Sequence, residues 1–164
     1  MADLLVEKNE GIATLTFNRP DARNALSTDM RSNLRDVLAE LEFDDDIRCV
    51  VMQGADGHFM AGGDVKRFVN YVDEPASKIR ASFIQRIHDL HPIMFTMRRM
   101  PKPIVASVAG AAAGAGVSMA LAADLVIAAD SAFFTLAYVH IGTSPDGSAT
   151  FNLPRAVGIK KAME

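Results

Sequence analysis

A stretch of small residues between an apolar strand and a helix constrains this chain more than any other feature. Residues 104–108 are apolar and rich in β-branched side chains, which predicts a buried strand. The six residues 111–116 that follow carry side chains no larger than a methyl group. Such a segment allows a ligand or another backbone to approach closely, although tight packing of the next helix explains it equally well.

The rest of the chain alternates between strand and helix patterns. Strands are expected at residues 2–7, 11–17, 48–53, 125–129 and 132–136, with a hairpin joining the first two. Helices are expected after the N-cap residue Ser27, at residues 76–100 and up to Ala123, with a short one opening at Asp64. This order predicts an α/β fold in one domain over residues 1–164. Residues 159–164 look like the first turns of another helix without a stop signal, so we expect the chain to be truncated there.

Composition excludes several classes of function. The net charge of −3 leaves no broad basic surface for nucleic acid. No apolar run reaches the roughly 18–20 residues that span a bilayer, and the N-terminus lacks the regions of a signal peptide. The single cysteine, Cys49, excludes an internal disulfide and fits a reducing compartment. We therefore expect a cytoplasmic protein that binds neither nucleic acid nor a membrane.

Residues 59–64 form a second segment in which small residues lead into a helix. Ala61, Gly62 and Gly63 expose the backbone before Asp64 starts the helix. Amides at a helix N-terminus have no partner within the helix and can receive an anion or a developing oxyanion. Taken alone, this segment is more simply an ordinary turn that Asp64 caps.

Asp146 is the acidic residue best placed for chemistry. It follows a proline and precedes a glycine, downstream of an apolar strand. Taken alone, it is more simply a turn or N-cap residue, which is a common position for aspartate.

Two further patterns partly match other kinds of binding site, one for a dinucleotide and one for a metal ion. Gly114-Ala115-Gly116, with Asp130 after the next strand, partly matches a dinucleotide-binding fingerprint, but Met119 stands where close packing requires glycine or alanine. His88 and His91 are three residues apart on a predicted helix, yet no third ligand lies nearby. We therefore expect no metal site, and a dinucleotide site only as an alternative.

Together, four segments of the sequence resemble the crotonase family, the enoyl-CoA hydratase/isomerase superfamily. They occur in the family's order and spacing over nearly the whole chain, as Asn18-Arg19-Pro20 with Arg23-Asn24-Ala25-Leu26, Phe59 to Asp64, Lys102 to Ala106 running into Gly110 to Gly116, and Leu121 to Leu125 leading to Gly142-Thr143-Ser144-Pro145. The resemblance implies a spiral of β-β-α turns and a homotrimer or hexamer completed by C-terminal helices beyond Glu164.

The resemblance also implies roles for particular residues. Gly63 and Ala115 would supply the backbone amides of an oxyanion hole for an acyl-CoA thioester, with no cofactor besides the coenzyme A of the substrate. The CoA entrance and the thioester site would be formed by Arg23, Ala25, Leu26, Ala61, Gly62 and Asp64, with Gly114 and Tyr138 also beside the substrate.

Departures from the family pattern favour an isomerase over a hydratase. The two glutamates of the family's hydratases correspond here to Ser118 and Tyr138, neither of which is a carboxylate. Asp146 is similar to an aspartate found in phenylacetate-type isomerases of the family, and in some dehalogenases as a nucleophile. The resemblance thus makes Asp146 the expected catalytic base, surrounded by the apolar residues Phe134, Leu136, Tyr138 and Val139. A hydratase and a non-catalytic acyl-CoA-binding protein remain alternatives.

Overall fold

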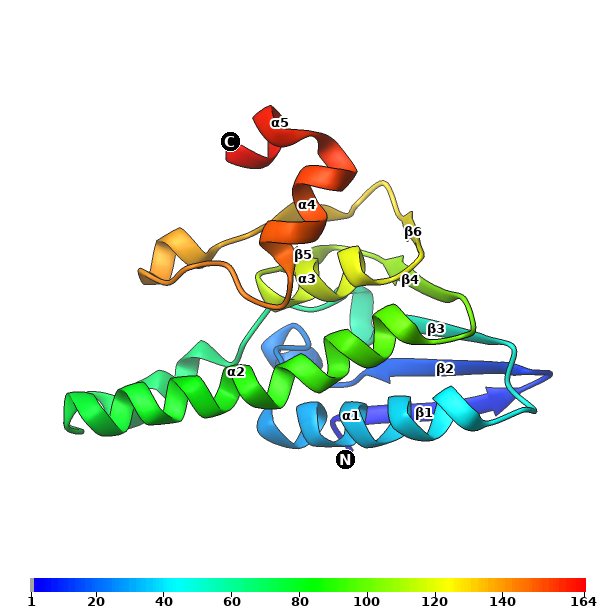
Figure 1. Ribbon diagram of the computed structural model, residues 1–164, viewed down its shortest axis with the longest axis horizontal. Coiled ribbons are helices and arrows are strands. Elements are labelled where there is room, and N and C mark those ends of the chain that lie inside the picture. The colour runs from blue at the N-terminus through cyan, green and yellow to red at the C-terminus, as the bar shows by residue number, and fades with distance from the viewer. Residues whose placement is uncertain (1) are drawn as a thin grey trace.

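The fold is built on a five-stranded sheet that two long helices cross on one face (Figure 1). The computed structural model describes residues 2–164. The strands lie in the order β1 (Leu4–Asn9), β2 (Ile12–Phe17), β3 (Cys49–Gly54), β4 (Ile104–Val108) and β6 (Leu125–Ala128). β1 and β2 are antiparallel, which confirms the predicted hairpin, and every later pairing is parallel.

Each later strand of this sheet is followed by a short paired segment and then by a helix. β4 leads to β5 (Ala111–Ala113) and α3 (Ala115–Ala122), while β6 leads to β7 (Phe133–Thr135) and α4 (Ala149–Val157). β5 pairs in parallel with β7 and also bridges to Met60, which follows β3. This repeat confirms the predicted α/β spiral of β-β-α turns.

The structure corrects the sequence prediction at residues 111–113. These three alanines were expected in a loop, but they form the strand β5. Alanine has little intrinsic preference for a strand, so the pairing with Met60 and with β7 decides the conformation. The helix α4 was not predicted either.

The helices agree closely with their sequence patterns. α1 (Thr28–Phe43) begins where Ser27 accepts a hydrogen bond from the Met30 amide at 3.0 Å, as an N-cap does. α2 (Ala76–Arg99) continues through an internal proline, and α5 (Ile159–Met163) ends the chain. The expected short helix after Asp64 is a 3-10 helix, η3 (Val65–Tyr71), and its N-terminus is not capped by the Asp64 side chain. Three single-turn 3-10 helices complete the elements, at η1 (Pro20–Ala22), η2 (Ala55–Gly57) and η4 (Tyr138–Ile141).

The hydrophobic core lies between the sheet and helices α1, α2 and α3. Its largest fully buried side chains include Phe17 of β2 and Phe59, whose rings meet edge to face with centroids 5.4 Å apart. This contact fixes the start of the segment 59–64 against the sheet. No helix within residues 2–164 is long and apolar enough to cross a membrane.

Candidate active site

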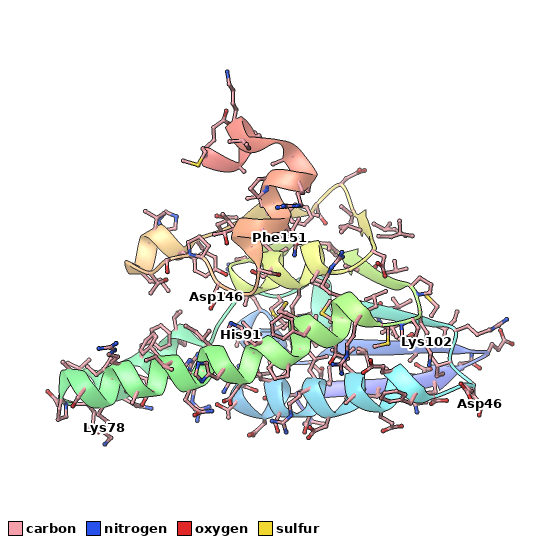
Figure 2. All side chains as sticks on the ribbon, in the orientation of Figure 1. Asp46, Lys78, His91, Lys102, Asp146 and Phe151 are labelled. Atoms are coloured by element: carbon pink, nitrogen blue, oxygen red, sulfur yellow. The ribbon has the colours of Figure 1, made fainter. Side chains whose placement is uncertain are left out.

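A cavity of about 770 Å³ separates the middle of α2 from the loop that follows β7. Residues 61–63 and 114–115 form its inner end, η3 and α2 form one wall, and residues 136–148 form the other. Figure 2 shows Asp146 in the loop above α2 and His91 on the helix below it; both line this cavity. The cavity therefore brings together segments that are far apart in the sequence.

Two backbone amides meet at the inner end of the cavity. Within residues 2–164, neither the Gly63 nor the Ala115 amide donates a backbone hydrogen bond. Ala115 begins α3, and its nitrogen lies 3.6 Å from the point where a side chain on Gly62 would start. A larger residue at Gly62, which has φ +91°, would fill this space. A free amide at such a position is a suitable donor to an oxygen atom that carries negative charge.

The segment 23–26 forms backbone hydrogen bonds with Ala61 and Gly62, the two residues before Gly63. The Ala61 amide donates to the Arg23 carbonyl at 2.9 Å, and the Leu26 amide donates to the Gly62 carbonyl at 2.7 Å. Leu26 lines the cavity, whereas Arg23 and Ala25 do not. The predicted CoA-entrance segment is thus also a scaffold for residues 61–63.

Asn24 lies within the segment 23–26 and stabilises it through side-chain hydrogen bonds, a role that the sequence analysis did not anticipate. Its side chain is fully buried and donates to the carbonyls of Ala55 and His58 at 2.8 and 2.6 Å. Its backbone has φ +58°, a conformation that asparagine tolerates better than most residues.

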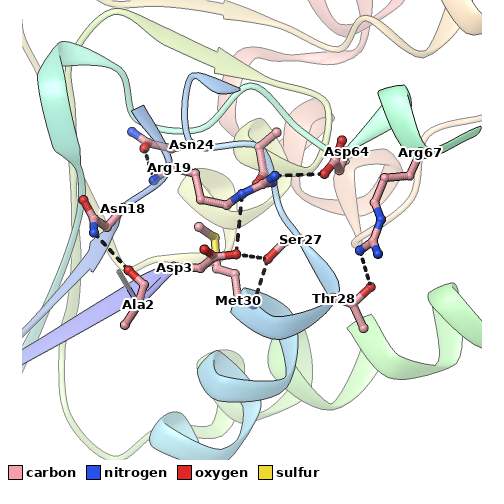
Figure 3. Close-up of polar contacts among 11 residues, drawn as sticks. Ala2, Asp3, Asn18, Arg19, Asn24, Ser27, Thr28, Met30, Asp64 and Arg67 are labelled. Atoms are coloured by element: carbon pink, nitrogen blue, oxygen red, sulfur yellow. Dashed lines mark hydrogen bonds and ion pairs between the residues drawn. The ribbon is translucent and has the colours of Figure 1, made fainter. Parts of the chain in front are cut away.

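Arg19 connects three segments beneath the site (Figure 3). Its Nη1 donates to the Ala25 carbonyl at 2.6 Å, its Nη2 pairs with Asp64 at 3.1 Å, and its Nε lies 3.5 Å from Asp3. Asp64 is buried by this pairing and does not line the cavity.

Replacing Arg19 by methionine is expected to destabilise the protein by about 2 kcal/mol, because Asp64 and the Ala25 carbonyl both lose a charged donor. Urea unfolding would measure the change. Arg35→Met is the matched control, since Arg35 pairs with Asp36 on the exposed face of α1 and should cost less than about 0.5 kcal/mol. Equal losses in the two variants would contradict the role given to Arg19.

The Asp146 carboxylate is held by a hydroxyl from η4. Tyr138 donates to Asp146 Oδ1 at 2.7 Å, and the Ser118 hydroxyl lies 3.3 Å from the Tyr138 hydroxyl. Ser118, fully buried on α3, also donates to the Asp146 carbonyl at 3.0 Å. Burial raises the pKa of Tyr138, so its hydroxyl keeps its proton and remains a donor at neutral pH. The two positions that depart from the family's glutamates therefore fix Asp146 in place.

The cavity gathers most of the predicted site residues and adds others. Gly63, Ala115 and Asp146 line it, as do Leu26, Ala61, Gly62, Gly114 and Tyr138. Arg23, Ala25 and Asp64 do not line it; Arg23 is exposed, whereas Ala25 and Asp64 are buried. Of the apolar residues expected around Asp146, Leu136 and Tyr138 line the cavity, whereas Phe134 and Val139 do not and are 48% and 81% exposed.

Four charged or titratable residues of the cavity were missed from the sequence, namely Arg31, Arg86, His91 and His140. The first three lie on long helices beside an apolar stripe, where a polar residue usually faces solvent, and His140 lies on η4. Among residues 2–164, no group of three or more His, Cys, Asp or Glu side chains is arranged to hold a metal ion.

The fold and this site define an α/β protein of the crotonase superfamily, in which two free amides and the Asp146 carboxylate line the same cavity. Residues 7–164 match the model of the family described as enoyl-CoA hydratase/isomerase, and the chain belongs to that family. A structure of an enoyl-CoA hydratase from Polaromonas sp. JS666 superposes with a TM-score of 0.88 at 37% identity, over 98% of this chain and 61% of that one.

Curated relatives include proteins with different named activities. The 1,2-epoxyphenylacetyl-CoA isomerase of Escherichia coli K12 is 37% identical over 99% of this chain and 61% of its own length. The 4-chlorobenzoyl coenzyme A dehalogenase-2 of an Arthrobacter species is 36% identical over 97% of this chain and 56% of its own length. The chain thus spans about three fifths of the length of these relatives.

Proposed function

We propose that the intact protein is an enoyl-CoA isomerase, which moves a double bond in an unsaturated acyl-CoA. The observation that carries this proposal is the Asp146 carboxylate, held by Tyr138 in the same cavity as the free amides of Gly63 and Ala115. Asp146 is the one carboxylate among the described residues that line the cavity. One carboxylate suffices to move a proton between two carbons, because no water is added.

The proposed reaction has two proton transfers. Asp146 removes a proton from the carbon between the thioester carbonyl and the double bond, and the electron pair moves onto the thioester oxygen to give an enolate. The amides of Gly63 and Ala115 donate to that oxygen; losing one such donor typically costs about 3–4 kcal/mol. The protonated Asp146 then returns the proton at the far end of the conjugated system. The proton removed from one carbon is returned to another, so no cofactor is needed besides the coenzyme A of the substrate.

A spectrophotometric assay of the intact protein with a 3-enoyl-CoA tests the proposal. Conversion to the conjugated 2-enoyl thioester is the expected result, since the product absorbs where the substrate does not. Absence of conversion while CoA binding persists would refute the isomerase and favour a non-catalytic acyl-CoA-binding protein. Titration with NAD should show no binding, which would dispose of the dinucleotide alternative.

Replacing Tyr138 by phenylalanine is expected to lower kcat about tenfold with little change in KM, because the Asp146 carboxylate loses the donor that orients it. Steady-state assays would separate the two constants, and Tyr71→Phe on η3, outside the cavity lining, serves as the control. An unchanged kcat would contradict the positioning role.

The free energy of unfolding should respond differently to alkaline pH in the native protein and in Tyr138→Phe. The native pKa of Tyr138 is raised above the ordinary value of 10.0, mainly by burial, so the neutral hydroxyl stabilises the native state below pH 10. This stability is lost as the pH rises toward the native pKa, whereas phenylalanine does not titrate. The free energy of unfolding of the native protein should therefore fall relative to that of Tyr138→Phe above pH 10.

The hydratase alternative has less support from this cavity. The two-glutamate route requires carboxylates at the positions of Ser118 and Tyr138, where the chain offers hydroxyls that bind each other and Asp146. A hydration assay with a 2-enoyl-CoA distinguishes the two reactions.

A dehalogenase is a second candidate, because His91 lines the cavity together with Asp146 and because a relative is named 4-chlorobenzoyl coenzyme A dehalogenase-2. In this reaction the Asp146 carboxylate would displace chloride from the acyl group to form an ester. Water, losing a proton to His91, would then hydrolyse the ester. Release of chloride from 4-chlorobenzoyl-CoA would support this candidate over the isomerase. With either activity we expect a homotrimer or hexamer for the intact protein.

A further inference from the structure

Arg31 offers free donors to the cavity that the proposed isomerisation does not use. The residue lies on α1, is 7% exposed and makes one side-chain hydrogen bond within residues 2–164, from Nη2 to Asp89 at 3.2 Å. No fully buried side-chain nitrogen among the described residues lacks a partner. Its Nε and Nη1 therefore still reach open space, and Arg31 forms part of the cavity wall.

Arg86 adds a second guanidinium to the same cavity from α2. It lies over the Phe68 ring, 5.1 Å from the centroid, and its Nη2 is 3.7 Å from the point where a side chain on Gly63 would begin. No acidic side chain within residues 2–164 forms a salt bridge with Arg86.

The two guanidiniums line the same cavity. Burial lowers the pKa of Arg31, and the nearby charge of Arg86 lowers it further, while Asp89 acts in the opposite direction. Asp89 balances one of the two positive charges. Arg86 has no salt-bridge partner among residues 2–164, although Asp146 lines the same cavity, and a guanidinium in this position is well suited to a planar carboxylate.

We propose that Arg31 and Arg86 form a subsite for a carboxylate at the end of the acyl group, so that the substrate is an acyl-CoA whose chain carries a second, free carboxylate. The proposal rests on the proposed function only in that the thioester oxygen lies at Gly63 and Ala115. The phosphates of coenzyme A are a poor fit for this subsite. The whole pantetheine arm separates the diphosphate from the thioester, whereas Arg86 lies beside Gly63.

Binding of saturated acyl-CoA thioesters to the intact protein tests the subsite without requiring turnover. Calorimetry would compare pairs of equal chain length that end in a methyl group or in a carboxylate. The native protein should bind the carboxylate-ended member roughly 10- to 100-fold more tightly at one or more chain lengths. Arg86→Met should abolish this preference, and Arg86→Lys should retain part of it. Arg98→Met, an exposed arginine on the same helix, should leave the preference intact.

Two results would overturn the subsite. The first is equal or weaker binding of the carboxylate-ended thioester at every chain length. The second is an Arg86→Met variant that weakens free CoA and both thioesters alike, which would assign Arg86 to the phosphates of coenzyme A. Failure of the isomerase assay leaves the binding comparison unaffected. If methyl-ended 3-enoyl-CoA is converted while the first of these results is found, the subsite fails and the proposed isomerase stands.

Discussion

Replacing Asp146 by asparagine is expected to lower turnover of a 3-enoyl-CoA about a thousandfold while leaving CoA binding intact. A positioned general base typically contributes on the order of 10²–10⁴ in rate, and Asp146 is the one carboxylate among the described residues lining the cavity. Asparagine keeps the size of the side chain and can still accept the hydrogen bond from Tyr138. The variant therefore removes the base without removing the contact that orients it.

Asp130→Asn is the matched control, because Asp130 is exposed after β6 and does not line the cavity. Turnover and CoA affinity should both stay at the native level in that variant. The assignment of Asp146 as the base would fail if Asp146→Asn converted 3-enoyl-CoA at the native rate. A loss of CoA binding together with activity would instead indicate that the site had been distorted.

Replacing Gly116 by alanine is expected to cost about 3 kcal/mol of unfolding free energy, one of the largest effects of a single methyl group in this protein. The added carbon would lie 2.3 Å from the Met60 carbonyl oxygen, and that oxygen already accepts a hydrogen bond from the Ala113 amide at 2.8 Å. Backbone must therefore move, and the pairing of Met60 with β5 would be disturbed. Thermal unfolding should shift down by about 10 °C.

Gly63→Ala provides the stability control for that experiment. A side chain at Gly63 would meet only Arg86, at 3.7 Å, which is an ordinary van der Waals contact. The same added methyl group should then change the melting temperature by no more than about 2 °C. Similar losses in the two variants would contradict the close backbone approach at Gly116.

The tertiary structure gives different roles to two neighbouring small residues, Ala115 and Gly116. Of the two interpretations of the segment 111–116, close packing is confirmed at Gly116, whereas the approach of a ligand stays a prediction. Gly116 is required for the close packing of α3 against Met60, whereas Ala115 presents a free amide to the cavity. Sequence composition alone could not separate them, because both roles require small side chains.

Apolar surface remains on the last turns of the spiral. The exposed fractions are 60% for Leu125 and 64% for Ile127 on β6, and 73% for Ile159 on α5. The strand pattern of β6 was predicted correctly, but strand periodicity does not reveal which of its faces another element covers.

The sequence by itself determined the order of the strands and helices apart from β5 and α4, the Ser27 cap, and the two stretches of small residues that precede helices. These features depend on residues close together in the chain, so hydrophobic periodicity and local capping reveal them. Only the tertiary structure decided that Tyr138 and Ser118 hold Asp146, that Asp64 pairs with Arg19, and that Arg31 and Arg86 line the same cavity as Asp146. The Ser118 and Arg19 contacts join residues that are distant in sequence, and the Tyr138 contact spans an irregular loop without periodicity. For Arg31 and Arg86, a helix pattern shows only that a polar residue borders the apolar stripe. The direction in which that residue points is fixed by the element packed against it.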